Sequence, residues 1–236
     1  IACIKVFYNY LRYQHIIEEN PFNQLRFQFR TEKILPKTIP YDILKNIFSY
    51  LEQRVVISKT DYQKQKAERN LLIISLLLST GIRISELCHI HLKDINLSNK
   101  TLHIIGKGKK ERILFLGDQT TFNLLETYIN KNGKESNDFL FPGKHSPKPL
   151  SEQSVRLILK RIVEQNGLSK TITPHMFRHS FATMLLDNDV DIRYIQQILG
   201  HSSISITQIY THVSHSKQKE ILSSFNPMSV IHSEIE

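Results

Sequence analysis

The chain has 236 residues, enough for one large domain or for one domain and part of another. Lysine and arginine number 31 against 22 acidic residues, and the formal net charge of +9 favours a polyanionic partner about as strongly as a merely basic soluble protein. The longest apolar run, 71–78, is too short to span a bilayer, and two cysteines without paired spacing exclude a disulfide framework. We therefore expect a cytoplasmic protein in a reducing compartment.

The first part of the chain predicts one helix followed by a basic linker. Apolar residues recur with a helical period over 3–19, and Asn20-Pro21 ends this pattern. Residues 20–38 are rich in basic side chains and contain prolines, which is typical of a linker. A single amphipathic helix cannot bury its own apolar face, so we expect this one to need a partner.

Beyond the linker, helical patterns surround one short region with a strand period. Helices are predicted at about 41–53, 61–79, 84–90, 119–131 and 152–166. Alternating apolar residues at 102–104 and 113–115 are typical of two strands joined by the turn residues Gly106-Lys107-Gly108. We therefore predict a mainly α fold with a small antiparallel β-sheet, in the α+β class.

Residues 79–87 follow the long apolar helix and place Arg83 at the start of a new helix, after the turn at Gly81. A guanidinium and backbone N–H groups at that position can both face a phosphate. Glu86, three residues later, can orient Arg83 or a facing histidine. The alternative is a helix-surface ion pair that stabilises the fold by under about 1 kcal/mol.

The turn around Lys107 belongs to a basic run that also contains Lys109, Lys110 and Arg112. Glycines on both sides of Lys107 allow a tight turn and a close approach of the backbone to a ligand. The spacing is not that of a phosphate-binding P-loop. A solvated charged turn is the common outcome for such runs, so DNA contact by these residues is a hypothesis.

A stretch over 173–212 places two imidazoles, a guanidinium and a phenol where they can surround one anion. A helix over 174–186 begins with proline after Thr173 as its N-cap. It carries His175 and Arg178 three residues apart, away from its apolar face and near its N-terminus, where an anion is favoured. Taken alone, such a pair is more often an ordinary solvated face.

The second half of this stretch predicts a helix over 191–199 that ends at Gly200, with His201 at a fixed corner directly after it. Ser203 can begin a further short helix that carries Tyr210. Each of the two functional groups has a structural alternative. The histidine can cap the preceding carbonyls, and the tyrosine can bury its ring while its hydroxyl stays in water.

Taken in order, the patterns T-G-x-R-x-x-E-L, G-K-G, H-x-x-R, L-G-H-S and a tyrosine nine residues after that histidine resemble the tyrosine recombinase (phage integrase) family. The resemblance covers about residues 38–215. It implies a catalytic domain at 38–236, with residues 1–37 as the end of a helical DNA-binding domain plus its linker. The catalytic set it implies is Arg83, Lys107, His175, Arg178, His201 and Tyr210, supported by Glu86.

The activity that the resemblance implies is site-specific recombination, in which Tyr210 forms a 3′-phosphotyrosine with DNA without ATP or metal. Two arginines suit the non-bridging oxygens of a phosphodiester, because a planar fork matches phosphate. Tyrosine is mostly protonated at neutral pH, so a base is needed, and His175 is our candidate. We expect His201 to hold the phosphate and Lys107 to protonate the departing 5′ oxygen.

Metal binding is an alternative for the histidines. His175 and His179 are four residues apart, and His212 and His215 are three apart, which are both possible ligand spacings. The chain lacks the H-E-x-x-H pattern and has no cysteine near these positions. We therefore predict no metal site and no cofactor, and loss of strand cleavage in a chelator would contradict this.

The expected partner is double-stranded DNA at recombination sites, bound by a homotetramer that is a monomer when free. Arg156, Lys160 and Arg161 lie on or near one helix face and are further candidate DNA contacts, with a solvated face as the equal alternative. The segment 217–225 has an apolar face that can dock on a neighbouring protomer or within its own chain. We expect the last ten residues to be loose.

Two other functions stay open at this point. A type IB topoisomerase shares the tyrosine chemistry, but its pattern usually has lysine in place of the histidine that opens H-x-x-R. A DNA-binding regulator without chemistry is the other alternative. A phage, a mobile genetic element or chromosome-dimer resolution are all compatible settings for a recombinase.

Overall fold

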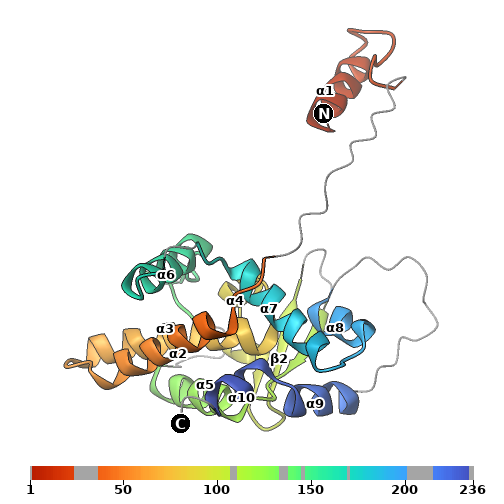
Figure 1. Ribbon diagram of the computed structural model, residues 1–236. Coiled ribbons are helices and arrows are strands. Elements are labelled where there is room, and N and C mark those ends of the chain that lie inside the picture. Colours follow the sequence, from red (N-terminus) through yellow and green to blue (C-terminus); the bar gives the residue numbers. More distant parts are fainter. Residues whose placement is uncertain are drawn as a thin grey trace. The chain divides into compact units, whose positions relative to one another are not determined.

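The computed structural model describes residues 2–23, 37–106, 111–132, 138–144, 147–168, 171–200 and 215–233, with the backbone alone for residues 2 and 215–219. The chain divides into two compact units, Ile1–Leu35 and Pro36–Glu236 (Figure 1). No described helix is long and apolar enough to cross a membrane.

The first unit contains helix α1 (Ala2–Tyr13), which ends six residues earlier than the predicted limit of 19. The chain leaves the helix through His15, whose φ of 57° is left-handed and incompatible with continued α-helix. The buried side chain of Asn20 then donates hydrogen bonds to the Lys5 carbonyl and to Asn9 Oδ1 over 3.2 and 2.7 Å. These bonds fold the segment after the helix back onto α1.

The second unit is mainly helical, as the sequence predicts (Figure 1). Its helices are α2 (Tyr41–Val56), α3 (Asp61–Thr80), α4 (Ile84–Cys88), α5 (Gln119–Asn132), α6 (Glu152–Gln165), α7 (Pro174–Asp187), α8 (Ile192–Leu199), α9 (His215–Ser224) and α10 (Pro227–His232), with a 3₁₀ turn, η1 (Leu92–Asp94). The predicted helices within the described residues agree with these bounds within a few residues, except that α10 falls where we expected a loose end. The helix predicted to begin at Ser203 lies outside the described residues.

Helix α3 forms the centre of this unit and packs against α2, α5, α7 and α10. Its second half, from Leu72 to Thr80, is buried without a break, which a helix achieves only when neighbours cover it on all sides. Thr60 caps its start, and Gly81 ends it in the left-handed region, with φ of 60°. The turn at Gly81 leads the chain directly into Arg83.

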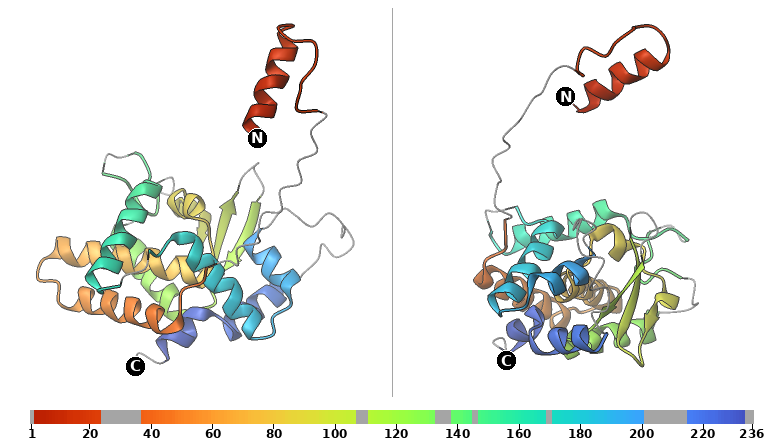
Figure 2. Two further views of the ribbon diagram at one scale, coloured as in Figure 1. Left: turned by 45° about the horizontal axis from the view of Figure 1, so that its top comes forward. Right: turned by 90° about the vertical axis from the view of Figure 1, so that its right-hand side faces the viewer.

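The sheet is antiparallel with strand order β1-β2-β3, formed by β1 (Ile95–Asn96), β2 (Thr101–Ile105) and β3 (Glu111–Phe115). This confirms the predicted α+β class, and α9 lies beside β3 (Figure 2). The alternating apolar residues at 113–115 do not all face the core. Leu114 is fully buried opposite Leu102, whereas Ile113 is 41% exposed.

The end of the chain is ordered into α9 and α10, so the prediction that its last ten residues are loose is wrong for 227–232. Leu222, Met228 and Ile231 are fully buried in the core of the same chain. Asn226 caps α10 through the Met228 N–H and also donates to the Ser79 carbonyl over 3.1 Å. Of the predicted apolar face at 217–225, Ile221 and Leu222 are buried within this chain, whereas Phe225 is 39% exposed.

Candidate active site

From the predicted catalytic set the described residues include Arg83, His175 and Arg178, together with the supporting residue Glu86. The other three members, Lys107, His201 and Tyr210, lie outside the described residues, as do the predicted DNA contacts Lys109 and Lys110. The structure therefore describes one part of the predicted site, which is formed by the ends of α3 and α8, the start of α4 and the first turns of α7.

Arg83 is the N-cap of α4 and lies against the end of α8. Its backbone is extended, and its Nη1 donates to Glu86 Oε1 over 2.9 Å while Nη2 donates to the Gly200 carbonyl over 3.2 Å. About a third of the side chain, 34%, is exposed. Arg83 therefore joins two segments far apart in sequence and still has a guanidinium surface open to a ligand.

Glu86 is buried, with 4% of its side chain exposed, and both of its oxygens are fully engaged. It accepts the backbone N–H and Nη1 of Arg83, and also a two-pronged contact from Arg112 Nη1 and Nη2 at 3.0 and 2.8 Å. Burial opposes ionisation, but hydrogen bonds and charge from Arg112, followed by those from Arg83, lower the pKa of Glu86 from 4.5 to about 2. The surface-pair alternative is therefore wrong.

Arg178 is 6% exposed and ties two helix ends together. Its Nη1 donates to the Gly81 carbonyl and its Nη2 to the Leu199 carbonyl, each over 2.6 Å. Burial, followed by the positive charges of Arg83 and Arg112, lowers the pKa of Arg178 from 12.5 to about 10, while Glu86 acts in the opposite direction. The guanidinium is therefore still charged at neutral pH.

His175 occupies the first turn of α7, directly after Pro174, and its side chain is exposed. Thr173 is the N-cap as predicted, although its side chain makes no capping hydrogen bond. The imidazole borders a cavity of about 620 Å³ that Arg156, Lys160 and Thr171 also line. This cavity places basic side chains of α6 beside the candidate base.

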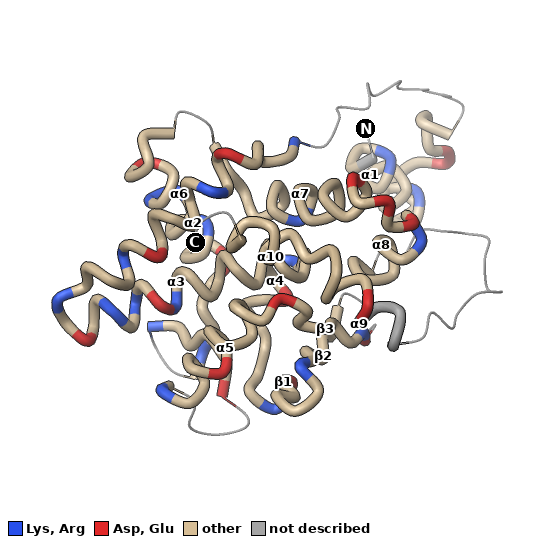
Figure 3. Tube along the Cα trace, turned by 60° about the horizontal axis from the view of Figure 1, so that its bottom comes forward, with Lys and Arg blue, Asp and Glu red and all other residues tan. Residues whose placement is uncertain are grey.

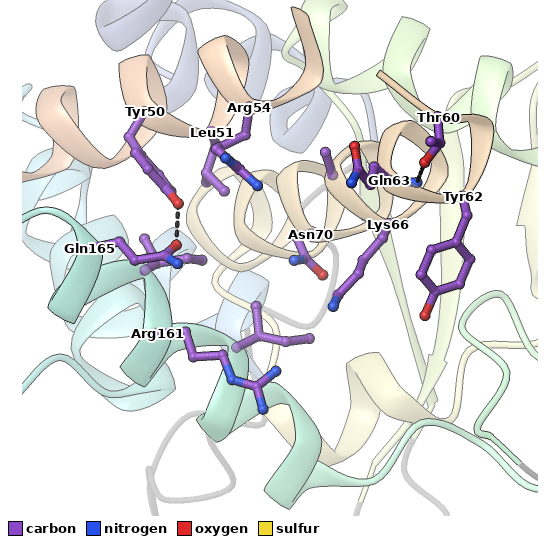
Figure 4. Close-up of a pocket in the computed structure, with 13 residues that line it drawn as sticks. Tyr50, Leu51, Arg54, Thr60, Tyr62, Gln63, Lys66, Asn70, Arg161 and Gln165 are labelled. Carbon is purple, nitrogen blue, oxygen red and sulfur yellow. Dashed lines mark hydrogen bonds between the residues drawn. The ribbon is translucent and has the colours of Figure 1, made fainter. Parts of the chain in front are cut away.

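The three basic residues of α6 do not share one face, contrary to the prediction. Arg156 and Lys160 are four residues apart and line the cavity beside His175. Arg161 follows one residue later, which turns it by about 100° around the helix. It lines a different cavity of about 450 Å³ between α2, α3 and α6, together with Arg54 and Lys66 (Figure 4).

Basic residues are spread along α2, α3 and α6 (Figure 3). On α6, Arg156 donates to Glu152 over 2.7 Å, and the Lys160 ammonium lies 3.7 Å from Glu164. Both pairs are exposed, and such pairs are worth at most about 1 kcal/mol. They are therefore weak enough to exchange for contacts to a phosphate.

Arg112 was predicted to contact DNA, but its hydrogen-bond donors point into the protein. Besides Glu86, its Nε donates to the Ile198 carbonyl over 3.2 Å, and 14% of the side chain is exposed. It lies opposite Ile104 in the strand register and on the same sheet face as Leu114. Residues 112 and 114 lie on one face of the strand, and residue 113 lies on the other. The sequence signal for an inward-facing arginine was therefore its position two residues before Leu114.

Within the described part of the chain, no group of three or more His, Cys, Asp and Glu residues is placed to hold a metal ion. His179 lies close enough to His175 and Arg178 for their charges to act on it. Burial, followed by those two side chains, lowers the pKa of His179. The side chains of His212 and His215 lie outside the described residues.

Comparison with known proteins identifies the family of the chain. Residues 48–217 match the phage integrase family. A tyrosine recombinase of Agathobacter rectalis is 51% identical over 236 residues, which cover 98% of this chain and 76% of that relative. Tyrosine recombinase XerD of Listeria innocua is 35% identical over 233 residues, which cover 96% of this chain and 74% of that relative.

Solved structures show the same fold. XerH site-specific recombinase bound to its difH substrate matches with a TM-score of 0.64 and 27% identity, over 92% of this chain and 61% of that one. XerA recombinase matches with a TM-score of 0.59 and 26% identity, over 92% of this chain and 80% of that one. The chain therefore belongs to the phage integrase family. It is a tyrosine recombinase, an enzyme that cuts and rejoins DNA strands, which confirms the predicted class.

Proposed function

We propose that this chain carries out site-specific recombination through a 3′-phosphotyrosine on Tyr210. The observation that supports this most directly is the meeting of two arginines at the end of α8. Arg83 donates to the Gly200 carbonyl, and Arg178 donates to the Leu199 carbonyl next to it. Both cations therefore lie at the corner that leads into His201.

Two cations at one corner suit a phosphodiester whose negative charge grows as it is attacked. A guanidinium carries five N–H bonds, so the bonds described above leave each arginine further donors for the non-bridging oxygens. Each preorganised donor contributes roughly 10²–10³ to the rate of such a reaction. The buried position of Arg178 strengthens its effect, because a charge acts more strongly where water is excluded.

The remaining roles rest on the family resemblance and on the chemistry of each group. His175 takes the phenolic proton as the Tyr210 oxygen forms its bond to phosphorus. The bond from phosphorus to the 5′ oxygen breaks, and Lys107 gives that oxygen a proton. His201 holds a non-bridging oxygen. The phosphotyrosine keeps the bond energy, so a 5′ hydroxyl of another strand reverses the step without ATP or metal.

The protein's arrangement in the reaction is also part of the proposal. Residues 38–236 act as the catalytic domain, and residues 1–37 are the end of a DNA-binding domain with its linker. Exchange between two duplexes involves four strands, so we propose a homotetramer on two double-stranded sites and a monomer in free solution, acting at the nucleoid. Light scattering with and without bound duplex tests the proposed oligomeric states. A protein that stays monomeric when two DNA sites are supplied would contradict the tetramer.

A type IB topoisomerase and a regulator without chemistry are the competing functions, and one plasmid experiment separates all three. Binding sites are first selected from a random pool, and two copies are placed in a supercoiled plasmid. We expect products with the intervening segment deleted or inverted. Relaxation without exchange would indicate a topoisomerase, and binding without any change in the plasmid would indicate a regulator.

A further inference from the structure

Arg112 connects three separate segments of the candidate active site. It lies on β3, and its side chain reaches Glu86 of α4 and the Ile198 carbonyl of α8. The contact to Glu86 pairs two parallel N–H groups with two carboxylate oxygens, which is the strongest and most directional form of this ion pair. At 14% and 4% exposure, the two side chains are shielded from water.

The aliphatic part of Arg112 also packs against the corner after α8. Gly200 adopts φ of 64° there, and a Cβ added to this glycine would lie 3.0 Å from Arg112 Cδ. A side chain at position 200 would therefore press on the arginine stem. The same corner receives the Arg83 Nη2 hydrogen bond, so Arg112 and Arg83 hold it from two directions.

We propose that Arg112 is a positioning residue for strand cleavage, which fixes Glu86, Arg83 and the corner before His201 without contacting DNA. The inference rests on the proposed strand-transfer function. In this proposal Arg112 acts by positioning neighbouring residues. The family resemblance gave Arg112 no role, and its place in the basic run had suggested a direct contact with DNA instead.

Charge balance gives Arg112 a second effect on the same site. Arg83, Arg112 and Arg178 face Glu86 among the described residues, which leaves two net positive charges in the cluster. Without Arg112 one net positive charge remains, and Glu86 has only Arg83 as its hydrogen-bonded ion-pair partner. The carboxylate then competes with the scissile phosphate for Arg83, which weakens the transition state more than the bound substrate.

Lysine cannot replace arginine in this role. It carries one charge on a flexible stem and cannot donate two parallel hydrogen bonds to a carboxylate. It also has no third donor placed to reach the Ile198 carbonyl at the same time. Arg112→Lys therefore keeps the charge and loses the geometry, while Arg112→Met loses both.

The test measures single-turnover formation of the covalent adduct on a nicked suicide duplex, together with the duplex Kd and its salt slope. The variants are Arg112→Lys, Arg112→Met, Glu86→Gln and the double variant, with Arg54→Met as a matched arginine control. We expect about 30-fold slower cleavage for Arg112→Met and about 10-fold for Arg112→Lys, with Kd changed less than about threefold. In the Glu86→Gln background, Arg112→Met should slow cleavage by less than about threefold.

A second readout is the pH profile of cleavage, which a purely structural role would not move. Losing Arg112 leaves Glu86 with less positive charge around it, so the acid-side loss of activity should begin at higher pH in Arg112→Met than in the wild type. If Arg112→Met fails to fold, Arg112→Lys replaces it, with about 10-fold slower cleavage, a Kd changed less than about threefold and a smaller pH shift, because lysine keeps the positive charge.

Three results would overturn the proposal. Cleavage unchanged in both Arg112 variants would remove the role, and losses that multiply fully in the double variant would separate Arg112 from Glu86. A weaker Kd with a smaller salt slope would return Arg112 to direct phosphate contact. Failure of the proposed function looks different, because the wild type itself would then form no adduct.

Discussion

Glu86 lies buried among three arginines. Two of them, Arg83 and Arg112, donate hydrogen bonds to it, and the third, Arg178, is close enough for the charge of Glu86 to act on its pKa. The spacing of Arg83 and Glu86 in sequence predicts that they interact. It does not predict the burial of the pair, because that depends on β3 bringing Arg112 across to α4. A buried carboxylate needs this many donors, since an unpaired charge at such a site would be strongly destabilising.

Because the pKa of Glu86 is low, the free energy of unfolding depends on pH in the acid range. Its pKa is about 2 in the folded state against 4.5 as the ordinary value, so the carboxylate stabilises the fold fully above about pH 4.5 and this contribution is lost as pH falls towards 2. We expect the wild type to lose about 2 kcal/mol more unfolding free energy between pH 5 and 2.5 than Glu86→Gln. Denaturant titrations over this pH range measure it, and equal slopes would contradict it.

At the scale of elements, the site depends on the two helices that end in left-handed glycines, α3 at Gly81 and α8 at Gly200. Arg178 binds a carbonyl at each of these ends. The sequence predicts both helix ends from the glycines alone. It does not predict the contact between them, because that comes from how α7 packs against α3 and α8.

A side chain added at Gly81 should lower the free energy of unfolding. A Cβ there would lie 2.6 Å from Phe181 Cδ1 and 2.7 Å from Leu199 Cδ2, at φ of 60°. Gly167 is a matched control, because its φ of 63° is similar and nothing lies within 4 Å of an added Cβ. We expect Gly167→Ala to cost about 1 kcal/mol and Gly81→Ala about 1–3 kcal/mol more. Equal losses in chemical denaturation would show that the space around Gly81 is open.

The split of basic residues on α6 predicts different effects on DNA binding. Arg156 lines the cavity beside His175, whereas Arg161 lines the one between α2, α3 and α6 (Figure 4). We expect Arg156→Ala to weaken binding to a selected duplex and to reduce the salt slope by about 1, and Arg161→Ala to leave the slope unchanged. Binding isotherms at several salt concentrations measure both slopes. An unchanged slope in Arg156→Ala would remove it from the interface.

At the scale of the whole molecule, the fold class was largely predictable because long helices and short strands differ in the period of their apolar residues. The end of the chain was not. Residues 227–232 are too few for a clear period, and their helix is stabilised by burial of Met228 and Ile231 and by the Asn226 cap. The residues of the candidate site were assigned only through the family patterns, since the described parts of that site lie on four helices and a strand.

Docking of α10 in cis predicts a stability cost for changes in the tail. Met228 is fully buried, so Met228→Ala should lower the unfolding free energy by about 2–5 kcal/mol. Val230 on the same helix is 39% exposed, and Val230→Ala should cost less than about 1 kcal/mol. Denaturant unfolding of the two variants measures this. Equal and small losses would indicate that the tail does not stay on its own chain in solution.

Covalent capture on a nicked suicide duplex tests the central claim most directly. The duplex loses a short fragment after cleavage, so the phosphotyrosine cannot be reversed. We expect the wild type to form an adduct in the presence of chelator, with the DNA phosphate on a peptide containing Tyr210, and Tyr210→Phe to form none. An adduct that persists in Tyr210→Phe, or one that requires a divalent metal, would contradict the mechanism.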